Sequence, residues 1–340
     1  MDEFKRIAID TAKSLFTLHG VDARERPVLR RNVRRGDLLA FFGKLAPTEV
    51  AMEACGGSHH WARSLAALGH DVRLIPPQYV KPFVKRSKND RNDAEAISEA
   101  ASRPMMRFVP VKTAQQQADA MLLSIRELLV AQRTQLVNAL RGHAAELGLV
   151  APIGAKGLAQ LRAEVALEAS LPDAAVAALT LLGNEIDRLE LRLSEIDAKL
   201  IAQHKATPMS QLLAQIPGIG PIGGLSLALR VDARQFASAR HFAAWVGLTP
   251  RQNSTAGKQR LGGISRAGNE RLRQLLVLGA TTVIQHAKPG RAGVSPWLLS
   301  LLERCPRKVA AVALANKMAR IVWAMMTSGE AYRRQTAVAH

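Results

Sequence analysis

The chain has 340 residues, of which 47 are Lys or Arg and 28 are Asp or Glu, so its formal net charge is +19. Hydrophobic residues make up 48% of the chain, which excludes wholesale disorder. No uninterrupted apolar run reaches the roughly 18 residues of a membrane span. The two cysteines, Cys55 and Cys305, are too few for a disulfide framework or a four-cysteine zinc site, and they fit a reducing cytoplasm.

The excess of basic residues indicates a polyanionic partner, most simply nucleic acid. Aromatic residues make up only 4% of the chain, so contacts to phosphates should dominate over base stacking. The basic residues are most concentrated between residues 233 and 302, where the only acid is Glu270. A solvated face explains most charge runs, but this imbalance favours a nucleic-acid surface.

The first hundred residues mix strand-like and helix-like segments. We expect strands at residues 6–10, 16–21, 28–33, 49–53 and 72–75, and helices at residues 36–45, 58–68 and 90–101. This mixture predicts an α/β domain with a largely covered sheet, which we assign to residues 1–110.

Strand signals disappear after residue 115, and long helices are expected at 115–146 and 172–204. In the second helix, apolar residues recur in alternating steps of three and four at Leu179, Leu182, Ile186, Leu189, Leu193, Ile196 and Leu200. This heptad spacing fits either a coiled coil that pairs subunits or a long helix packed on its own domain. We assign residues 111–208 to a helical, coiled-coil segment and residues 209–340 to a compact, mainly helical domain.

Four carboxylates are candidates for a metal site. Asp10 and Glu53 each end a predicted strand, and Asp90 and Asp93 share one face of a predicted helix. Converging carboxylates repel one another unless a cation joins them, and such oxygen ligands suit Mg²⁺ or Mn²⁺. Two such ions can clamp the oxygens of a phosphoryl transfer. Taken singly, each acid also fits a turn or helix-cap role.

Two segments of the last domain carry further signals. The sequence IPGIG at residues 216–220 resembles a helix-hairpin-helix, in which Gly218 and Gly220 allow backbone N–H groups to meet a phosphate; the alternative is a tight turn between packed helices. Ser254 lies in a predicted loop, where a serine is usually a turn residue. Its hydroxyl becomes a nucleophile only when a base, a metal or a cationic setting activates it.

These motifs, in this order, resemble those of the DEDD-type, serine-dependent transposases of bacterial insertion sequences (the one-ten and eleven-eleven group), described as bridge-RNA-guided recombinases. The resemblance covers nearly the whole chain. It is carried by DTAK at 10–13, MEA at 52–54, KNDRNDA at 88–94, IPGIG at 216–220, FAAWVGLTP at 242–250 and GGISRAGN at 262–269.

The resemblance implies an amino-terminal RuvC-like, ribonuclease-H fold and a carboxy-terminal transposase domain. It implies that Asp10, Glu53, Asp90 and Asp93 bind Mg²⁺ or Mn²⁺ and that Ser254 becomes linked to DNA. It further implies donor DNA, target DNA and a bridge RNA as partners, and a homo-oligomer that is a dimer or a tetramer. The expected location is the bacterial cytoplasm, with no membrane. The nucleic-acid contacts expected in the last domain are Gly218, Gly220, Arg251, Lys258, Arg260, Arg266, Arg271 and Arg273.

Three alternatives stay open at this point. Counting forward from Pro250 places the family serine at Thr255, whereas counting back from Ser265 places it at Ser254, which we prefer because loops absorb one-residue changes. A metal-dependent, RuvC-like nuclease would use water in place of the serine. The third is a non-enzymatic nucleic-acid binder, against which the carboxylate set argues. An actin-like ATPase is disfavoured, because the first hundred residues lack its glycine-rich phosphate loops.

Overall fold

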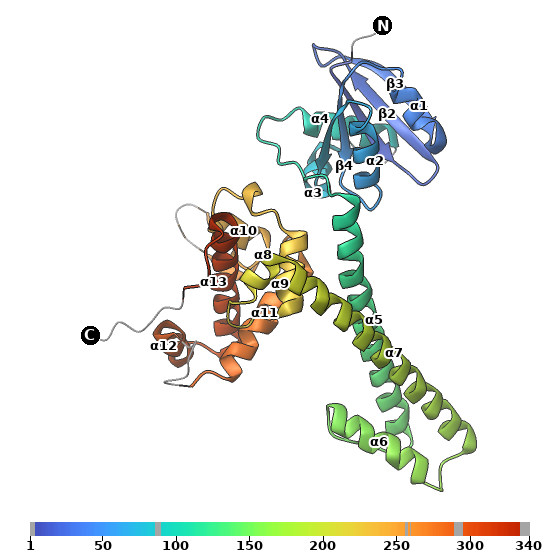
Figure 1. Ribbon diagram of the computed structural model, residues 1–340, viewed down its shortest axis with the longest axis vertical. Coiled ribbons are helices and arrows are strands. Elements are labelled where there is room, and N and C mark those ends of the chain that lie inside the picture. The colour runs from blue at the N-terminus through green and yellow to red at the C-terminus, as the bar shows by residue number, and fades with distance from the viewer. Residues whose placement is uncertain (1–3, 86–89, 256–257, 259, 289–294, 334–340) are drawn as a thin grey trace. The chain divides into compact units, whose positions relative to one another are not determined.

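The computed structural model describes residues 4–85, 90–255, 258, 260–288 and 295–333 (Figure 1). The chain divides into two compact units, Met1–Ala118 and Asp119–His340. Most of the helical segment expected at 111–208 therefore groups with the carboxy-terminal part of the chain.

The first unit is built on a five-stranded sheet with the strand order β3-β2-β1-β4-β5. Its strands are β1 (Arg6–Thr11), β2 (Leu15–Val21), β3 (Pro27–Arg34), β4 (Glu49–Glu53) and β5 (Asp71–Ile75). Strands β1, β2 and β3 pair antiparallel, whereas β4 pairs in parallel with both β1 and β5. Each of the five predicted strands is confirmed to within one residue at either end.

Helices cover both faces of this sheet, as the sequence predicted. They are α1 (Leu38–Phe42), α2 (Ser58–Ala66), α3 (Pro77–Val80) and α4 (Asp90–Ala101), with short 3-10 turns at Arg35–Asp37 and Lys81–Phe83. Because side chains alternate along a strand, Ile7 and Ile9 pack in the core that contains Phe42 of α1. On the opposite face, Ala8 packs with Ile97 of α4.

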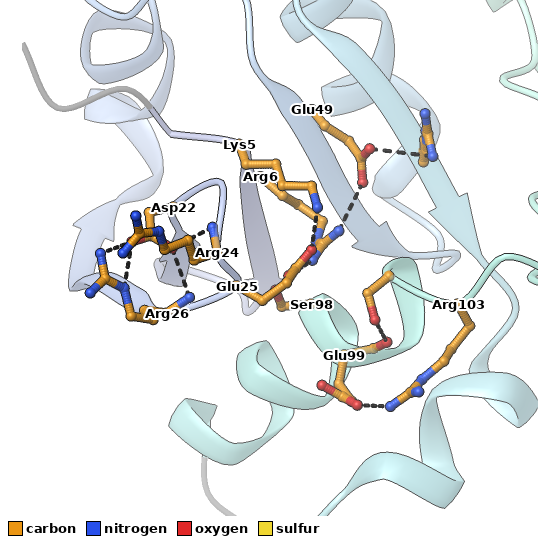
Figure 2. A network of polar contacts seen from close by, with 12 residues as sticks. Lys5, Arg6, Asp22, Arg24, Glu25, Arg26, Glu49, Ser98, Glu99 and Arg103 are labelled. Atoms are coloured by element: carbon orange, nitrogen blue, oxygen red, sulfur yellow. Dashed lines mark hydrogen bonds and ion pairs between the residues drawn. The ribbon is translucent and has the colours of Figure 1, made fainter.

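Arg6 joins several parts of this unit, and its side chain is only 3% exposed. Its guanidinium forms ion pairs with Glu25 and with Glu49 (3.6 Å) and donates to Ser98 Oγ on α4 (3.4 Å), as Figure 2 shows. These contacts connect β1 to the β2–β3 turn, to β4 and to α4.

We therefore expect Arg6→Ala to destabilise the first unit by about 3 kcal/mol. This value is at the low end for breaking a buried ion pair, because Glu49 keeps its second ion pair, with Arg73. Hydrogen exchange of the β1 amides measures this loss of local stability. Lys5→Ala is the control, because the exposed Lys5–Glu25 pair should contribute less than about 1 kcal/mol. Equal exchange in both variants would contradict the assigned role of Arg6.

The second unit is mainly helical, and a two-stranded antiparallel sheet of β6 (Pro250–Gln252) and β7 (Leu261–Ile264) interrupts its helices. The helices are α5 (Ala114–Glu146), which begins in the first unit, α6 (Ala155–Leu167), α7 (Asp173–Ala206), α8 (Pro208–Leu213), α9 (Pro221–Arg230), α10 (Ala239–Trp245), α11 (Glu270–Gln285), α12 (Pro296–Arg304) and α13 (Arg307–Ser328). Neither α6 nor the β6–β7 hairpin was predicted from the sequence.

The heptad positions of α7 are covered by helices of the same chain. Leu179 and Ile186 pack with Leu140 of α5 and Leu161 of α6, and Leu200 packs with Leu123 of α5. Ion pairs flank this seam at Arg126–Asp197, Arg133–Glu190 (3.8 Å) and Arg162–Asp187 (2.7 Å). The apolar side chains of this seam are therefore covered within the chain, which favours the interpretation of a long helix packed on its own domain; pairing of subunits through α7, like the homo-oligomer itself, stays a prediction.

Helix α13 lies in the core of the carboxy-terminal part of the second unit. Its buried residues include Ala315, Met318 and Val322, which pack with Phe242 of α10 and Leu276 of α11. By length and composition alone, α13 is apolar enough to cross a membrane. Its burial in this core gives its apolar composition a structural cause.

Candidate active site and nucleic-acid interface

Asp10 and Glu53 lie side by side at the carboxyl ends of two neighbouring strands. Strands β1 and β4 run parallel with Ile9 opposite Met52, so the next residue on each strand is the carboxylate. The flanking residues Ile9 and Met52 face the core beneath α1 and α2. By alternation, both carboxylates belong to the sheet face that α4 covers, and both are half-buried.

Helix α4 brings Asp93 toward this edge of the sheet. Burial raises the pKa of Glu53, and the negative charge of Asp93 raises it further. Asp90 begins the same helix, but its side chain lies outside the described residues. The structure thus brings two of the four predicted carboxylates into electrostatic contact and places a third, Asp10, on the strand beside Glu53.

The carboxylates at this edge can be compared with the ligands that a divalent metal ion needs. Within the described ranges, no group of three or more His, Cys, Asp or Glu side chains is placed to hold a metal ion. The chemistry of the donors nevertheless fits a divalent cation, because burial and the nearby charge of Asp93 both disfavour the ionised Glu53, and a cation bound between the two carboxylates would offset both effects. Asp10, Glu53 and Asp93 are thus suitable oxygen donors, and the four-ligand arrangement stays a prediction.

Ser254 lies in the loop that connects β6 and β7 of the hairpin, as the sequence predicted. Its Oγ accepts a hydrogen bond from the backbone N–H of Arg260 (3.2 Å), and its side chain is half-buried. Thr255 is exposed and pairs with Lys258 through the backbone near the end of the hairpin. This hydrogen bond ties Ser254 to the backbone of Arg260 across the loop, in a segment that also carries the exposed base Lys258.

The base of this hairpin is tightly constrained. The Arg273 guanidinium donates to the carbonyl oxygens of Val246 (3.0 Å) and Ala267 (2.9 Å), which lie on either side of the hairpin. At Gly268, where φ is +67°, a Cβ would come within 1.7 Å of the Trp245 carbonyl oxygen. These contacts fix the two chain segments that enter and leave the hairpin.

Two arginines of the predicted nucleic-acid surface have structural partners instead. Arg273 is buried and bonded to backbone carbonyls, so its predicted contact to nucleic acid is wrong. Arg271 and Arg230 both form ion pairs with Glu127 of α5 (3.1 Å each), so this carboxylate balances one of the two positive charges. The other four predicted side chains, Arg251, Lys258, Arg260 and Arg266, are exposed on or beside the hairpin.

The glycine motif joins α8 and α9 in a tight helical hairpin, as the sequence predicted. At Gly218, where φ is +89°, an added Cβ would come within 2.6 Å of the Gly279 carbonyl oxygen on α11, whereas a Cβ on Gly220 would meet nothing within 4 Å. Gly218 is therefore needed for helix packing, and Gly220 is the glycine of the pair with open space before it.

This difference predicts opposite results for two matched substitutions. Gly218→Ala should destabilise the second unit by about 3 kcal/mol, because the new methyl group meets backbone at a left-handed position. Gly220→Ala should fold normally and lower DNA affinity if its N–H group meets a phosphate. Thermal unfolding and fluorescence anisotropy separate the two effects, and a well-folded Gly218→Ala variant would contradict the packing assignment.

A polar pocket that the sequence analysis did not single out lies between β2, β3 and the start of α4. Its lining includes His19, Arg30 and Arg91. Burial lowers the pKa of His19, so its ring is mainly neutral at pH 7. The Arg30-Arg31-Asn32 run on an edge strand was the available sequence signal, but only the register places it beside α4.

Comparisons with known proteins agree with this arrangement. Residues 210–294 match the Transposase IS116/IS110/IS902 family, and residues 7–147 match the DEDD transposase family of IS110 elements. The chain is 52% identical to a putative transposase, y4pF/y4sB, of Sinorhizobium fredii, over 98% of this chain and 87% of that protein. It is 47% identical to a probable family 20 transposase of Pseudomonas aeruginosa, over 96% of this chain and 98% of that protein.

A third relative is the transposase for insertion sequence element IS1111A of Coxiella burnetii, with 42% identity over 98% of this chain and 92% of that protein. The two family matches lie on the two parts of the chain that carry the carboxylates and the serine hairpin. The chain therefore belongs to the IS110/IS116/IS902 family of insertion-sequence transposases.

Proposed function

We propose that this transposase is a recombinase that cleaves and rejoins DNA through a phosphoserine intermediate on Ser254. The observation that carries the proposal is the pair of carboxylates, Asp10 and Glu53, level at the end of β1 and β4 with Asp93 acting on Glu53. The serine in its basic hairpin supplies the second half of the chemistry. The strand order, with antiparallel strands followed by parallel ones and helices on both faces, supports a RuvC-like, ribonuclease-H fold.

In this proposal, Asp10, Glu53, Asp90 and Asp93 hold Mg²⁺ or Mn²⁺. When bound, the metal supplies Lewis-acid stabilisation of the oxygens on the reacting phosphate. The four carboxylates would be the ligands that hold this metal at the edge of the sheet. Asn substitution at any of them would remove one anionic oxygen from the set.

The role of Ser254 is to exchange one phosphate ester for another. Its Oγ forms a bond to phosphorus, the strand hydroxyl leaves, and the energy of the phosphodiester is kept in the new serine ester. The hydroxyl of another strand reverses the step, so no ATP is needed. Lys258 and Arg260 are placed to stabilise negative charge on the attacking and leaving oxygens.

The proposal includes partners that follow from the family resemblance. Donor and target DNA would be paired by a bridge RNA, and the carboxylates and serine would come from different subunits of a homo-oligomer. The exposed basic side chains of the hairpin, at Arg251, Lys258, Arg260 and Arg266, support contact with phosphates.

The direct test is a covalent adduct. The purified protein would be incubated with DNA carrying the element ends, its flanking non-coding RNA and Mg²⁺, and then denatured. An adduct that survives denaturation supports the serine mechanism. Cleavage without an adduct favours the second candidate, a metal-dependent nuclease that uses water, for which the carboxylate edge alone suffices.

A further inference from the structure

A polar cavity of about 250 Å³ adjoins the carboxylate edge of the first unit. Its lining comes from β2, β3 and α4 and includes Thr17, His19, Arg30, Asn32, Arg91 and Glu95. The cavity lies outside the set of carboxylates and outside the serine hairpin, and neither the metal nor the nucleophile requires it.

The strand register places this cavity next to Asp10, on the same face of the sheet. Asp10 is paired with Thr17, and Thr17 is paired with Asn32, so the three residues are level across β1, β2 and β3. Residues paired in this way point to the same face of the sheet, which is the face that α4 covers. Two inter-strand spacings, about 10 Å in all, separate Asp10 from Asn32.

The cavity has an excess of positive charge. Among the residues that the structure describes, Glu95 is the single acid in the lining, and it pairs with Lys85 and, at 3.9 Å, with Arg30. Since Lys85 matches the charge of Glu95, the charges of Arg30 and Arg91 remain in excess. Arg31 also lines the cavity, but its guanidinium lies over the Phe41 ring, 5.5 Å from the centroid, on the other face of β3, so its charge is not counted.

The groups around the cavity match the chemistry of a phosphodiester. Arg30 is 61% exposed and Arg91 is exposed, so both guanidinium groups are accessible to a ligand. A guanidinium fork binds the paired oxygens of a phosphate, and hydroxyl and amide groups such as those of Thr17 and Asn32 can donate to the same oxygens. The neutral ring of His19 adds hydrogen-bonding capacity without adding charge.

We propose that this cavity binds a backbone phosphate of the DNA strand whose scissile phosphate lies at the carboxylates. The inference rests on the proposed function for the identity of that strand. Arg30 and Arg91 hold the neighbouring phosphate and thereby set which phosphate along the strand reaches Asp10 and Glu53. They are positioning residues, and they take no part in bond breaking.

The first experiment measures binding of the full-length protein to a labelled duplex that carries one element end. Arg30→Ala should lower the affinity by about tenfold, the effect of one lost charged hydrogen bond. The slope of log affinity against log salt should fall by about 0.9 for the one lost phosphate contact. Arg30→Lys should restore the slope, and Arg24→Ala, which removes an equal charge at the β2–β3 turn, should change neither quantity.

The second experiment locates the phosphate. Single phosphates of the same duplex are replaced one at a time by uncharged methylphosphonates, and binding and cleavage are measured for the wild type and for Arg30→Ala. We expect one position near the cleavage site at which the neutral linkage weakens the wild type but weakens Arg30→Ala no further. Such non-additivity is the signature of a direct contact.

The outcomes separate this inference from the function on which it rests. If Arg30→Ala binds DNA normally, or if the losses are additive at every phosphate, the cavity assignment is overturned. The proposed recombinase is unaffected by that result as long as the wild-type protein cleaves DNA. Coupling in the binding assay without any wild-type cleavage or adduct supports the cavity and contradicts the proposed chemistry.

Discussion

Ser254→Ala should give no covalent adduct with DNA and should lower recombination on the order of 10⁴-fold or more, the scale of losing a catalytic nucleophile. Ser254 Oγ accepts a hydrogen bond from the Arg260 N–H in the loop between β6 and β7, and in the proposed mechanism this oxygen attacks the phosphate. The measurement is gel analysis of denatured reactions with labelled DNA. Thr255→Ala is the matched control, and it should keep both adduct and recombination.

The threonine control decides an ambiguity of one residue. Thr255 carries a β-branched and more hindered hydroxyl, and it is exposed near the end of the hairpin. If Thr255→Ala is the inactive variant, the nucleophile is Thr255. If both variants cleave DNA when metal is present, water is the nucleophile and the nuclease candidate replaces the recombinase.

Asp10→Asn should lower the rate of strand cleavage by about 10³-fold or more, while the affinity for DNA stays nearly unchanged. The substitution keeps the size of the side chain but removes a negative charge from the carboxylate edge. A single-turnover cleavage assay in Mg²⁺ and an anisotropy titration measure the two properties separately. Glu53→Gln should behave in the same way, because Glu53 lies beside Asp10 on the neighbouring strand.

Asp71→Asn is a suitable control for these variants. Asp71 begins β5, at the opposite end of the strands from the carboxylates, and its side chain is 65% exposed beside Arg73. It should cleave DNA at the wild-type rate. Wild-type cleavage by Asp10→Asn would instead show that the metal site lies elsewhere in the chain.

The sequence predicted the first unit well because its signals are local. Strands β1 and β4 are short apolar runs that Asp10 and Glu53 follow, so parallel pairing alone brings these acids together. The helix at 90–101 has the same bounds in the structure as in the prediction. The contribution of Asp90 is not settled by this agreement, since its side chain lies outside the described residues.

The sequence was less informative where a local pattern does not identify its partner. The heptads of α7 correctly indicated an apolar seam, but spacing cannot distinguish a second subunit from α5 and α6 of the same chain. Charge counting likewise could not show that Arg273 turns inward to bind carbonyl oxygens. The β6–β7 hairpin escaped prediction because its strands are short and mostly exposed, so they lack hydrophobic alternation.

The constrained base of the serine hairpin has a consequence for how copies of such an element lose activity. Arg273 and Gly268 fix the chain on both sides of the hairpin without touching the hydroxyl. A single missense change at either position would therefore inactivate the protein, although its sequence would still contain the four carboxylates and the serine. A mobile element can thus lose activity first through residues that support the fold. A copy judged only by whether its reactive residues are present would then be classed wrongly as active.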